Sequence, residues 1–295
     1  MHLHRTFDLW LHDDEELVLF LQSTLLERVT LHEWPLSCVE RLTTSDGRKV
    51  IYKTQFGPTV ESECYAKAPS DLLPLGKTIY KVGGHVCMLI EFVEGPLIED
   101  LDFSEEDVVQ MGQEVTEQIS GIAVDFPYFM DVSTEEKWEE LVEATLQDME
   151  ALMDRGRFHL VDRATARHLE RWAFSTSALS AIRMNPGYVH GDLTGDNVFV
   201  LPDGYRVIDW QRPMLGPIDL NLATLLDSLG FNPSKYVDED IVRVMYFLRI
   251  HWLTQCARRW IPEAVGSYDQ QIMQLASRME NVHTYERNPN LQPVP

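Results

Sequence analysis

The side chains best suited to chemistry lie between residues 188 and 210. Asp192 lies on a predicted loop, Asn197 follows soon after it, and Asp209 ends a short apolar strand. A carboxylate on a loop can orient a hydroxyl group and accept its proton. An amide oxygen and a second carboxylate, brought together by a hairpin, are the hard oxygen ligands that Mg²⁺ prefers. The residue types and their order therefore predict proton transfer beside a bound metal ion.

Phosphoryl transfer has these same requirements. The acceptor hydroxyl must be oriented and deprotonated, Mg²⁺ must hold the phosphates, and charge on the transferred group must be neutralised. Asp192, Asn197 and Asp209 have the chemistry and the order for this reaction. The plainer interpretation of the segment is a turn rich in Asp, Asn and Gly that links buried strands. His190 is expected to be a packed structural histidine, because Asp192 already supplies a base.

The segment resembles the catalytic loop of aminoglycoside phosphotransferases, choline kinases and related small-molecule kinases. Their pattern is H-G-D-x-x-x-x-N followed by a strand ending in I-D, and this chain has HGDLTGDN followed by VIDW. The resemblance implies that Asp192 is the catalytic base, that Asn197 and Asp209 bind Mg²⁺, and that ATP is the phosphoryl donor. Gly191 and the Trp210-Gln211 pair differ from the H-R-D and D-F-G patterns of protein kinases.

Residues further upstream fit the same resemblance. Lys53 lies on an apolar strand predicted over 49–54, from which a lysine can reach the nucleotide phosphates. Its expected partner is a glutamate on the next predicted helix. Glu61 is preferred because Tyr65 lies one turn later on the same face, and Glu63 is the alternative.

The apolar strand predicted over 86–93 resembles the segment that links the two lobes in this family. The resemblance implies that the backbone at Glu91 and Val93 binds adenine. Residues before Lys53 contain the single Gly47 and so lack the glycine-rich loop with which protein kinases cover the phosphates. Asp219 resembles an aspartate that braces the catalytic loop in relatives, and we assign it a structural role.

The predicted elements are mixed strands and helices in the first part of the chain and mainly helices beyond it. This order indicates an α+β, bilobal, protein-kinase-like fold. We expect a nucleotide-binding N-terminal lobe over 1–93, a hinge at about 91–96, and a helical C-terminal lobe over 97–295 with the catalytic loop and the substrate pocket. The first part mixes strands and helices, expected over 13–26, 37–43, 49–54, 60–68 and 86–93. Beyond it, helices are expected over 104–124, 133–154, 162–183, 219–229, 238–260 and 263–280, interrupted by a hairpin over 198–209.

The chain is strongly acidic, with 47 Asp and Glu against 25 Lys and Arg and a formal net charge of −22. Such a surface repels nucleic acids and anionic lipid heads, so neither is expected as a partner. The N-terminus lacks the pattern of a signal peptide, and its longest apolar run is too short to span a bilayer. The four cysteines are scattered, which indicates reduced thiols in a cytoplasmic protein.

The acceptor is expected to be a small molecule that bears a hydroxyl group. The predicted helices carry acidic clusters interleaved with Trp138, Tyr236, Tyr246 and Trp252, and carboxylates with aromatic rings suit an ammonium ligand. An aminoglycoside or an amino alcohol is therefore preferred, and an amino acid or a sugar stays open. The alternative function is a nucleotide-binding pseudokinase or scaffold, which would have no need of the base Asp192.

Overall fold

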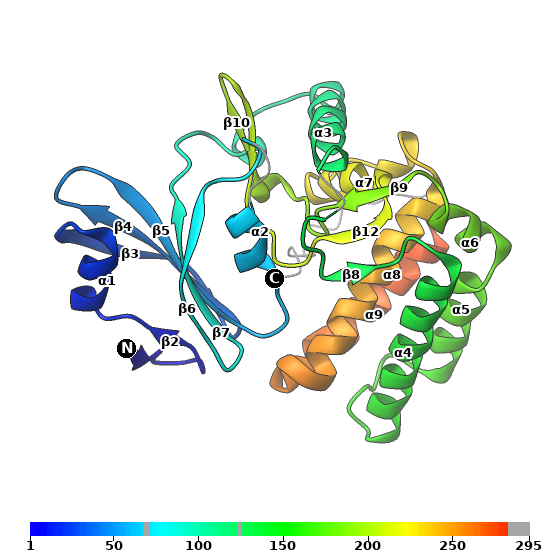
Figure 1. Ribbon diagram of the computed structural model, residues 1–295. Coiled ribbons are helices and arrows are strands. Elements are labelled where there is room, and N and C mark those ends of the chain that lie inside the picture. The colour runs from blue at the N-terminus through cyan, green and yellow to red at the C-terminus, as the bar shows by residue number, and fades with distance from the viewer. Residues whose placement is uncertain (68–70, 123–124, 283–295) are drawn as a thin grey trace. The chain divides into compact units, whose positions relative to one another are not determined.

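The computed structural model describes residues 1–67, 71–122 and 125–282, and the chain forms two units (Figure 1). The first unit holds residues 1–96, and two later stretches, 125–129 and 199–212, belong to it as well. The second unit holds 97–122, 130–198 and 213–282. The first long stretch thus ends inside the hinge expected over 91–96, whereas nothing in the sequence pattern indicated that later residues return to the first unit.

The first unit is built on a five-stranded antiparallel sheet. Its strands lie in the order β3 (Leu25–Trp34), β4 (Ser37–Thr44), β5 (Lys49–Phe56), β7 (His85–Glu91) and β6 (Gly76–Val82). The turn between β4 and β5 contains Gly47 at φ +84°, a conformation that glycine adopts without strain. Strand β5 lies at the centre of the sheet, and its residues 52–55 are buried on both faces.

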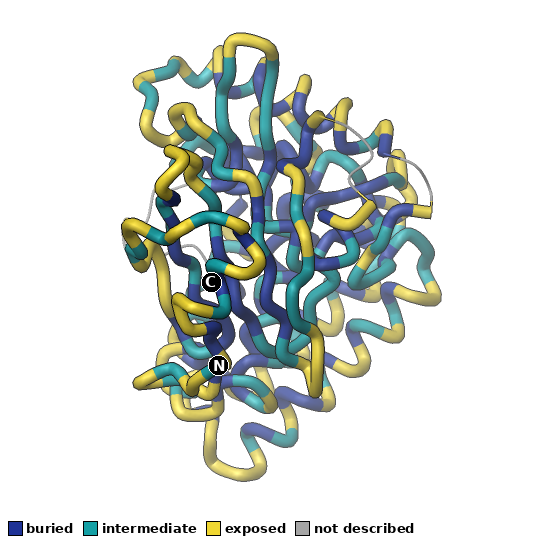
Figure 2. Tube along the Cα trace, turned by 60° about the vertical axis from the view of Figure 1, so that its left-hand side comes forward, coloured by how far each residue is buried: buried dark blue, intermediate teal, exposed yellow. Residues whose placement is uncertain are grey.

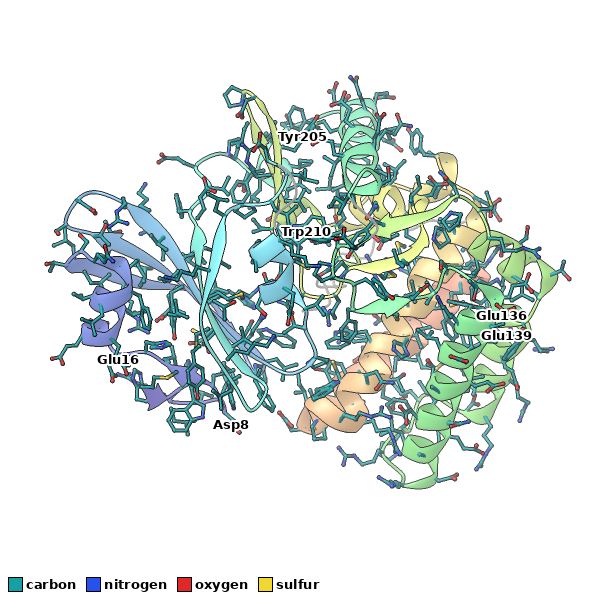
Figure 3. All side chains as sticks on the ribbon, viewed as in Figure 1. Asp8, Glu16, Glu136, Glu139, Tyr205 and Trp210 are labelled. Carbon is teal, nitrogen blue, oxygen red and sulfur yellow. The ribbon has the colours of Figure 1, made fainter. Side chains whose placement is uncertain are left out.

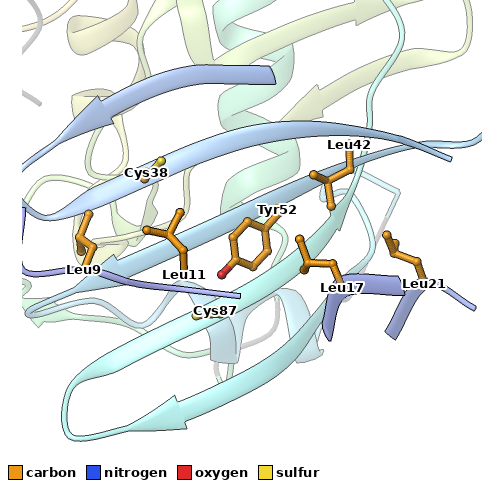
Figure 4. Packing of buried hydrophobic residues seen from close by; sticks show 8 residues of the cluster. All are labelled: Leu9, Leu11, Leu17, Leu21, Cys38, Leu42, Tyr52 and Cys87. Carbon is orange, nitrogen blue, oxygen red and sulfur yellow. The ribbon is translucent and has the colours of Figure 1, made fainter. Parts of the chain in front are cut away.

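Tyr52 and Lys53 are neighbours on β5 and therefore point to opposite faces of the sheet. Tyr52 enters a cluster formed with the hairpin of β1 (His2–Leu3) and β2 (Trp10–Leu11) and with α1 (Asp14–Leu21), as Figure 4 shows. Its hydroxyl accepts a hydrogen bond of 2.9 Å from the backbone of His12. Lys53 points to the other side, where α2 (Glu61–Lys67) lies.

The first predicted helix is too long. Helix α1 ends at Leu21 because Gln22 adopts the left-handed conformation with φ 53°. Leu25 then begins β3, whose register with β4 runs from the Leu25–Thr44 pair to the Trp34–Ser37 pair. The apolar residues up to Leu26 keep a helical spacing in the sequence, but pairing with β4 satisfies their backbone groups as a strand.

The second unit is mainly helical. It contains a small sheet of β8 (Met130–Asp131), β12 (Met214–Pro217) and β9 (Pro186–Val189), in that order. Its helices are α3 (Glu105–Ser120), α4 (Glu135–Asp154), α5 (Arg163–Ala173), α6 (Thr176–Ile182), α7 (Asp219–Ser228), α8 (Glu239–Gln255) and α9 (Val265–Glu280). Trp138 of α4, Trp172 of α5 and Phe247 of α8 pack their rings together in its core; buried positions are dark blue in Figure 2.

One helix expected over 162–183 is in fact two. Phe174 ends α5, and the Ser175 side chain caps α6 by accepting a hydrogen bond from the Ala178 backbone. A serine cap satisfies a donor that an unbroken helix would have bonded internally, and so it starts a new helix. Within the described residues, no helix combines the length and the apolar character needed to cross a membrane.

Candidate active site

Lys53 lies between two carboxylates inside the first unit. Its Nζ is 2.7 Å from Glu61 Oε2 and 2.6 Å from Asp209 Oδ1, and the Lys53 side chain is only 6% exposed. The structure thus places Glu61 against the lysine, whereas Glu63 pairs with Lys81 at the surface. Two carboxylates around one ammonium group leave the cluster with an excess of negative charge.

Burial and charge act in opposite directions on these three groups. Burial raises the pKa of Glu61 to about 7, and the attraction of Lys53 only partly offsets it. Burial also opposes ionisation of Asp209, yet the charge of Lys53 and its hydrogen bond keep the pKa of Asp209 below its usual value. Burial lowers the pKa of Lys53, but the two carboxylates outweigh it and raise that pKa overall. Lys53 and Asp209 are therefore ionised at neutral pH.

The turn that carries Asp209 follows β11 (Gly204–Val207) and has a strained backbone. Asp209 has φ +65°, which non-glycine residues adopt rarely. Its backbone N–H donates to the Tyr65 hydroxyl at 3.2 Å, and its Oδ1 accepts from Gln211 Nε2 at 2.7 Å. Trp210, which is labelled in Figure 3, is fully buried, and its ring meets Phe126 edge-on. These contacts hold the carboxylate of Asp209 beside Lys53.

The loop that carries Asp192 and Asn197 lies in the second unit, directly after β9. Gly191 has φ +86°, so the loop needs a glycine where protein kinases have arginine. Asn197 Nδ2 donates to the Asp192 carbonyl oxygen and to Thr194 Oγ1, both at 3.0 Å. The amide nitrogen of Asn197 thus bonds to two groups within its own loop. The other polar atom of the Asn197 side chain is its amide oxygen, Oδ1.

Helix α7 holds this loop at both ends. Asn221 Oδ1 accepts from the His190 backbone at 2.9 Å, and Ser228 Oγ accepts from the Gly195 backbone at 3.1 Å. The sequence interpretation assigned this bracing to Asp219 alone and missed Asn221 and Ser228. Their spacing on one helix after the H-G-D-x-x-x-x-N segment was the available signal. Asp219 begins α7, and burial raises its pKa.

The expected adenine-binding backbone lies at the end of β7. The Glu91 N–H donates to the Leu75 carbonyl at 2.8 Å, and Glu91 Oε2 accepts from the Leu75 N–H at 3.0 Å. The side chain and the N–H of Glu91 are therefore engaged by the segment before β6, so an adenine contact at this residue would fall to its carbonyl group. Val93 follows the strand and is half-buried.

Two of the aromatic residues that suggested an ammonium site belong to the core. Trp138 is fully buried, and Tyr246 is 2% exposed with its hydroxyl donating to Asp227 at 3.0 Å. The glutamates of α4 remain near the surface, as Figure 3 shows for Glu136 and Glu139, whereas Asp148 is buried. The carboxylates could attract a cation, but Trp138 and Tyr246 cannot enclose one.

A second group of possible metal ligands lies in the first unit, at His4, Glu33 and Cys38. His4 Nδ1 accepts hydrogen bonds from the backbone of Thr6 and Phe7, both at 3.2 Å. The neutral ring must then carry its proton on Nε2, the atom that faces Glu33. A protonated nitrogen cannot ligate a metal, and burial raises the pKa of the Cys38 thiol to about 12. We therefore interpret this group as a hydrogen-bonded His4–Glu33 pair beside the buried thiol of Cys38.

Comparisons with known proteins show the family and the fold of the chain. Residues 67–246 match the family model described as the phosphotransferase enzyme family. A search of curated proteins gave no match. Among solved structures, the chain is similar to a spectinomycin phosphotransferase in complex with ADP and spectinomycin, with a TM-score of 0.57, 14% identity, and coverage of 93% of this chain and 99% of that one.

Choline kinases are also similar in structure. The choline kinase of Cryptosporidium parvum Iowa II has a TM-score of 0.55 at 10% identity, over 87% of this chain and 90% of that one. A choline/ethanolamine kinase family protein of Mesorhizobium loti has a TM-score of 0.57 at 13% identity, over 90% and 88%. The α+β, protein-kinase-like fold expected from the sequence is thereby confirmed. Since the family model matches more than half of its residues, the chain belongs to the phosphotransferase enzyme family.

Proposed function

We propose that the protein transfers the γ-phosphoryl group of ATP to a hydroxyl group of a small molecule. The observation that carries the proposal is buried Lys53, held between Glu61 and Asp209. Burying a lysine costs free energy unless its charge is compensated by a partner. The positive point charge of Lys53 on this strand suits nucleotide phosphates. Membership of a phosphotransferase family supports the same reaction.

Asn197 and Asp209 are the proposed Mg²⁺ ligands, and their donor atoms fit that ion. The nitrogen of Asn197 is bonded inside its loop, so the amide oxygen is the atom that would bind metal. Asp209 is ionised because Lys53 keeps its pKa low. Both donors are hard oxygens of the kind that Mg²⁺ selects. When bound with ATP, Mg²⁺ neutralises charge on the phosphates.

Asp192 is the proposed base. Its carboxylate would accept the proton of the acceptor hydroxyl as that oxygen bonds to the γ-phosphorus and ADP leaves. The Glu91 carbonyl and the Val93 backbone are the proposed contacts to adenine, next to the apolar residues of β7.

The acceptor is proposed to be cationic, of the aminoglycoside or amino-alcohol type. The support is electrostatic: a net charge of −22 raises the local concentration of cations. Similar structures include a phosphotransferase in complex with spectinomycin and a choline kinase. Of the four aromatic residues, Tyr236 and Trp252 continue to support an ammonium ligand, since Trp138 and Tyr246 are buried.

The test is a screen for ATP consumption with amines, aminoglycosides and sugars, using Asp192→Asn beside the wild type. We expect Asp192→Asn to fold normally and to lose roughly 10²–10⁴-fold in turnover, the usual contribution of general-base catalysis. The matched control is Asp203→Asn, which removes an exposed carboxylate from the turn between β10 (Val198–Leu201) and β11.

Wild-type turnover in Asp192→Asn would remove this residue from the mechanism. Mg²⁺-dependent nucleotide binding without turnover of any acceptor would instead favour the nucleotide-binding scaffold.

A further inference from the structure

Helix α2 contributes a second buried side chain to the Lys53 cluster. Tyr65 lies one turn after Glu61, and the two residues are 4% and 1% exposed. Tyr65 acts to lower the pKa of Glu61 against the larger effect of burial. The Tyr65 hydroxyl accepts a hydrogen bond from the Asp209 backbone N–H at 3.2 Å. This hydroxyl thus connects helix α2, which carries the partner of Lys53, to the turn that carries Asp209.

The Asp209 turn needs such a connection because its backbone is strained. A non-glycine residue at φ +65° costs on the order of 1 kcal/mol or more and persists only where its surroundings fix it. The Asp209 N–H would be unpaired without the Tyr65 hydroxyl. A further bond joins the start of α2 to the same turn, because the Val60 N–H donates to the Gln211 carbonyl at 3.1 Å.

Strand β6 leaves a space that fits the Tyr65 side chain. A Cβ atom on Gly76 would lie 2.6 Å from Tyr65 Cβ and 2.9 Å from Tyr65 Cγ, closer than real atoms approach. Only glycine at position 76 therefore allows the ring its present place. The ring is confined by this contact while its hydroxyl accepts the hydrogen bond from Asp209, so the side chain has little freedom to move.

We propose that Tyr65 is a positioning residue, whose hydroxyl fixes the left-handed turn at Asp209 against helix α2 so that the Asp209 carboxylate is pre-arranged for Mg²⁺. This inference rests on the proposed function, in which Asp209 is a metal ligand. Tyr65 itself touches neither nucleotide nor metal. Its effect is transmitted through the backbone of Asp209.

The experiment compares Tyr65→Phe with Tyr52→Phe, which removes the hydroxyl of another buried tyrosine in the same unit. The Tyr52 hydroxyl bonds to His12 on the opposite face of the sheet. The first measurement is amide hydrogen exchange of residues 207–211 without ligand. The second is calorimetry of ADP binding with and without Mg²⁺.

We expect Tyr65→Phe to speed exchange of the 207–211 segment about 10-fold, as loss of one buried hydrogen bond allows. It should also reduce the gain in ADP affinity from Mg²⁺ about 10-fold, while Mg²⁺-free ADP binding changes less than about 2-fold. Tyr52→Phe should leave both quantities as in the wild type. If Tyr65→Phe does not fold, Gly76→Ala takes its place, because it crowds the ring and keeps the hydroxyl.

Unchanged exchange in Tyr65→Phe would overturn the proposal, and so would equal effects of Tyr52→Phe, which would mean a general loss of stability. Failure of the proposed function gives a different result. In that case, wild-type ADP binding would not respond to Mg²⁺, and the metal role of Tyr65 would fall with it. Exchange in the ligand-free variants would still report whether Tyr65 holds the turn.

Discussion

Asp209 is held by three hydrogen-bonded neighbours, two at its carboxylate and one at its backbone N–H. Lys53 and Gln211 bind its Oδ1 at 2.6 and 2.7 Å, and Tyr65 holds its backbone N–H. The proposed metal role of Asp209 depends on its carboxylate. The turn itself needs only a residue that tolerates positive φ. Asparagine also tolerates that conformation, which allows charge and backbone geometry to be separated by mutation.

We predict that Asp209→Asn keeps the turn but weakens Mg–ATP binding by about 10-fold or more, because a charged oxygen ligand becomes neutral. Binding of adenosine, which carries no phosphate, should change less than about 2-fold. Isothermal calorimetry with both ligands distinguishes these effects. Equal losses for Mg–ATP and adenosine would contradict the metal assignment.

Helix α7 and the loop that carries Asp192 are packed with almost no spare space at Gly195. A Cβ atom at this position would lie 2.6 Å from Leu229 Cδ2 and 3.1 Å from Glu99 Cβ. The same residue donates its N–H to Ser228. The loop can lie this close to the end of α7 because Gly195 has no side chain. A larger residue at position 195 must therefore displace the loop that holds Asp192.

Gly195→Ala is accordingly expected to lower kcat by roughly 10-fold or more, since small displacements of a catalytic group are costly, while the KM for ATP changes less. Adding Leu229→Ala removes the nearest obstructing atoms and should restore part of kcat. Steady-state kinetics of the single and double variants test this. A Gly195→Ala enzyme with wild-type kcat would show that the loop has room to adjust.

Helices α4 and α8 meet at His251, which is partly buried. Thr145 Oγ1 donates to the Leu141 carbonyl and must then accept from His251 Nδ1, each at 2.7 Å. Burial lowers the pKa of His251 to about 4, with the Asp148 charge opposing the shift. The folded protein therefore favours the neutral ring, whereas the unfolded chain binds a proton below its ordinary value of 6.5.

Because the folded pKa lies below the unfolded one, the contribution of His251 to stability is complete above about pH 6.5 and is lost as the pH falls toward 4. The loss is of order 2–3 kcal/mol. Denaturant unfolding between pH 4 and 7 measures the free energy of unfolding. This free energy should depend less steeply on pH in His251→Gln than in the wild type. His168→Gln, which removes a half-exposed histidine from α5, is the control. Identical pH profiles for all three proteins would refute the prediction.

Local sequence patterns predicted helices well where polar caps mark their ends, as Ser104 does for α3 and Thr134 for α4. Strands β9 and β12 were missed because each has four residues and their pairing partners lie far away in the sequence. Strand β6 was missed although it forms a hairpin with the next strand, β7. The H-G-D-x-x-x-x-N loop could be found because its residues are contiguous. Tyr65 could not be assigned a role, since its bond to Asp209 spans 144 positions and depends on tertiary packing.

At the scale of the whole molecule, the net charge of −22 creates a long-range field. A cationic acceptor should be attracted by this field, whereas ATP should be repelled except where Lys53 and Mg²⁺ supply positive charge. Salt shortens the reach of such a field from about 10 Å at 0.1 M to about 3 Å at 1 M.

We therefore predict that the KM of an amine-bearing acceptor rises several-fold between about 0.1 and 1 M salt, while the KM for Mg–ATP changes less. Initial rates over a salt series, with sodium chloride and a second monovalent salt, measure this. Turnover limited to neutral sugars or anionic compounds would contradict the cationic acceptor and leave the kinase assignment intact.

The return of residues 199–212 to the first unit has a consequence for synthesis on the ribosome. Lys53 and Glu61 leave the exit tunnel long before Asp209, which lies 156 positions after Lys53. The Leu72 carbonyl likewise cannot form its hydrogen bond of 2.7 Å until Val207, which donates its N–H, has been synthesised. Until then the nascent first unit contains a buried lysine with one carboxylate and an incomplete core. Domains that can fold alone do so as they emerge, but this one cannot finish before most of the second unit has also been translated.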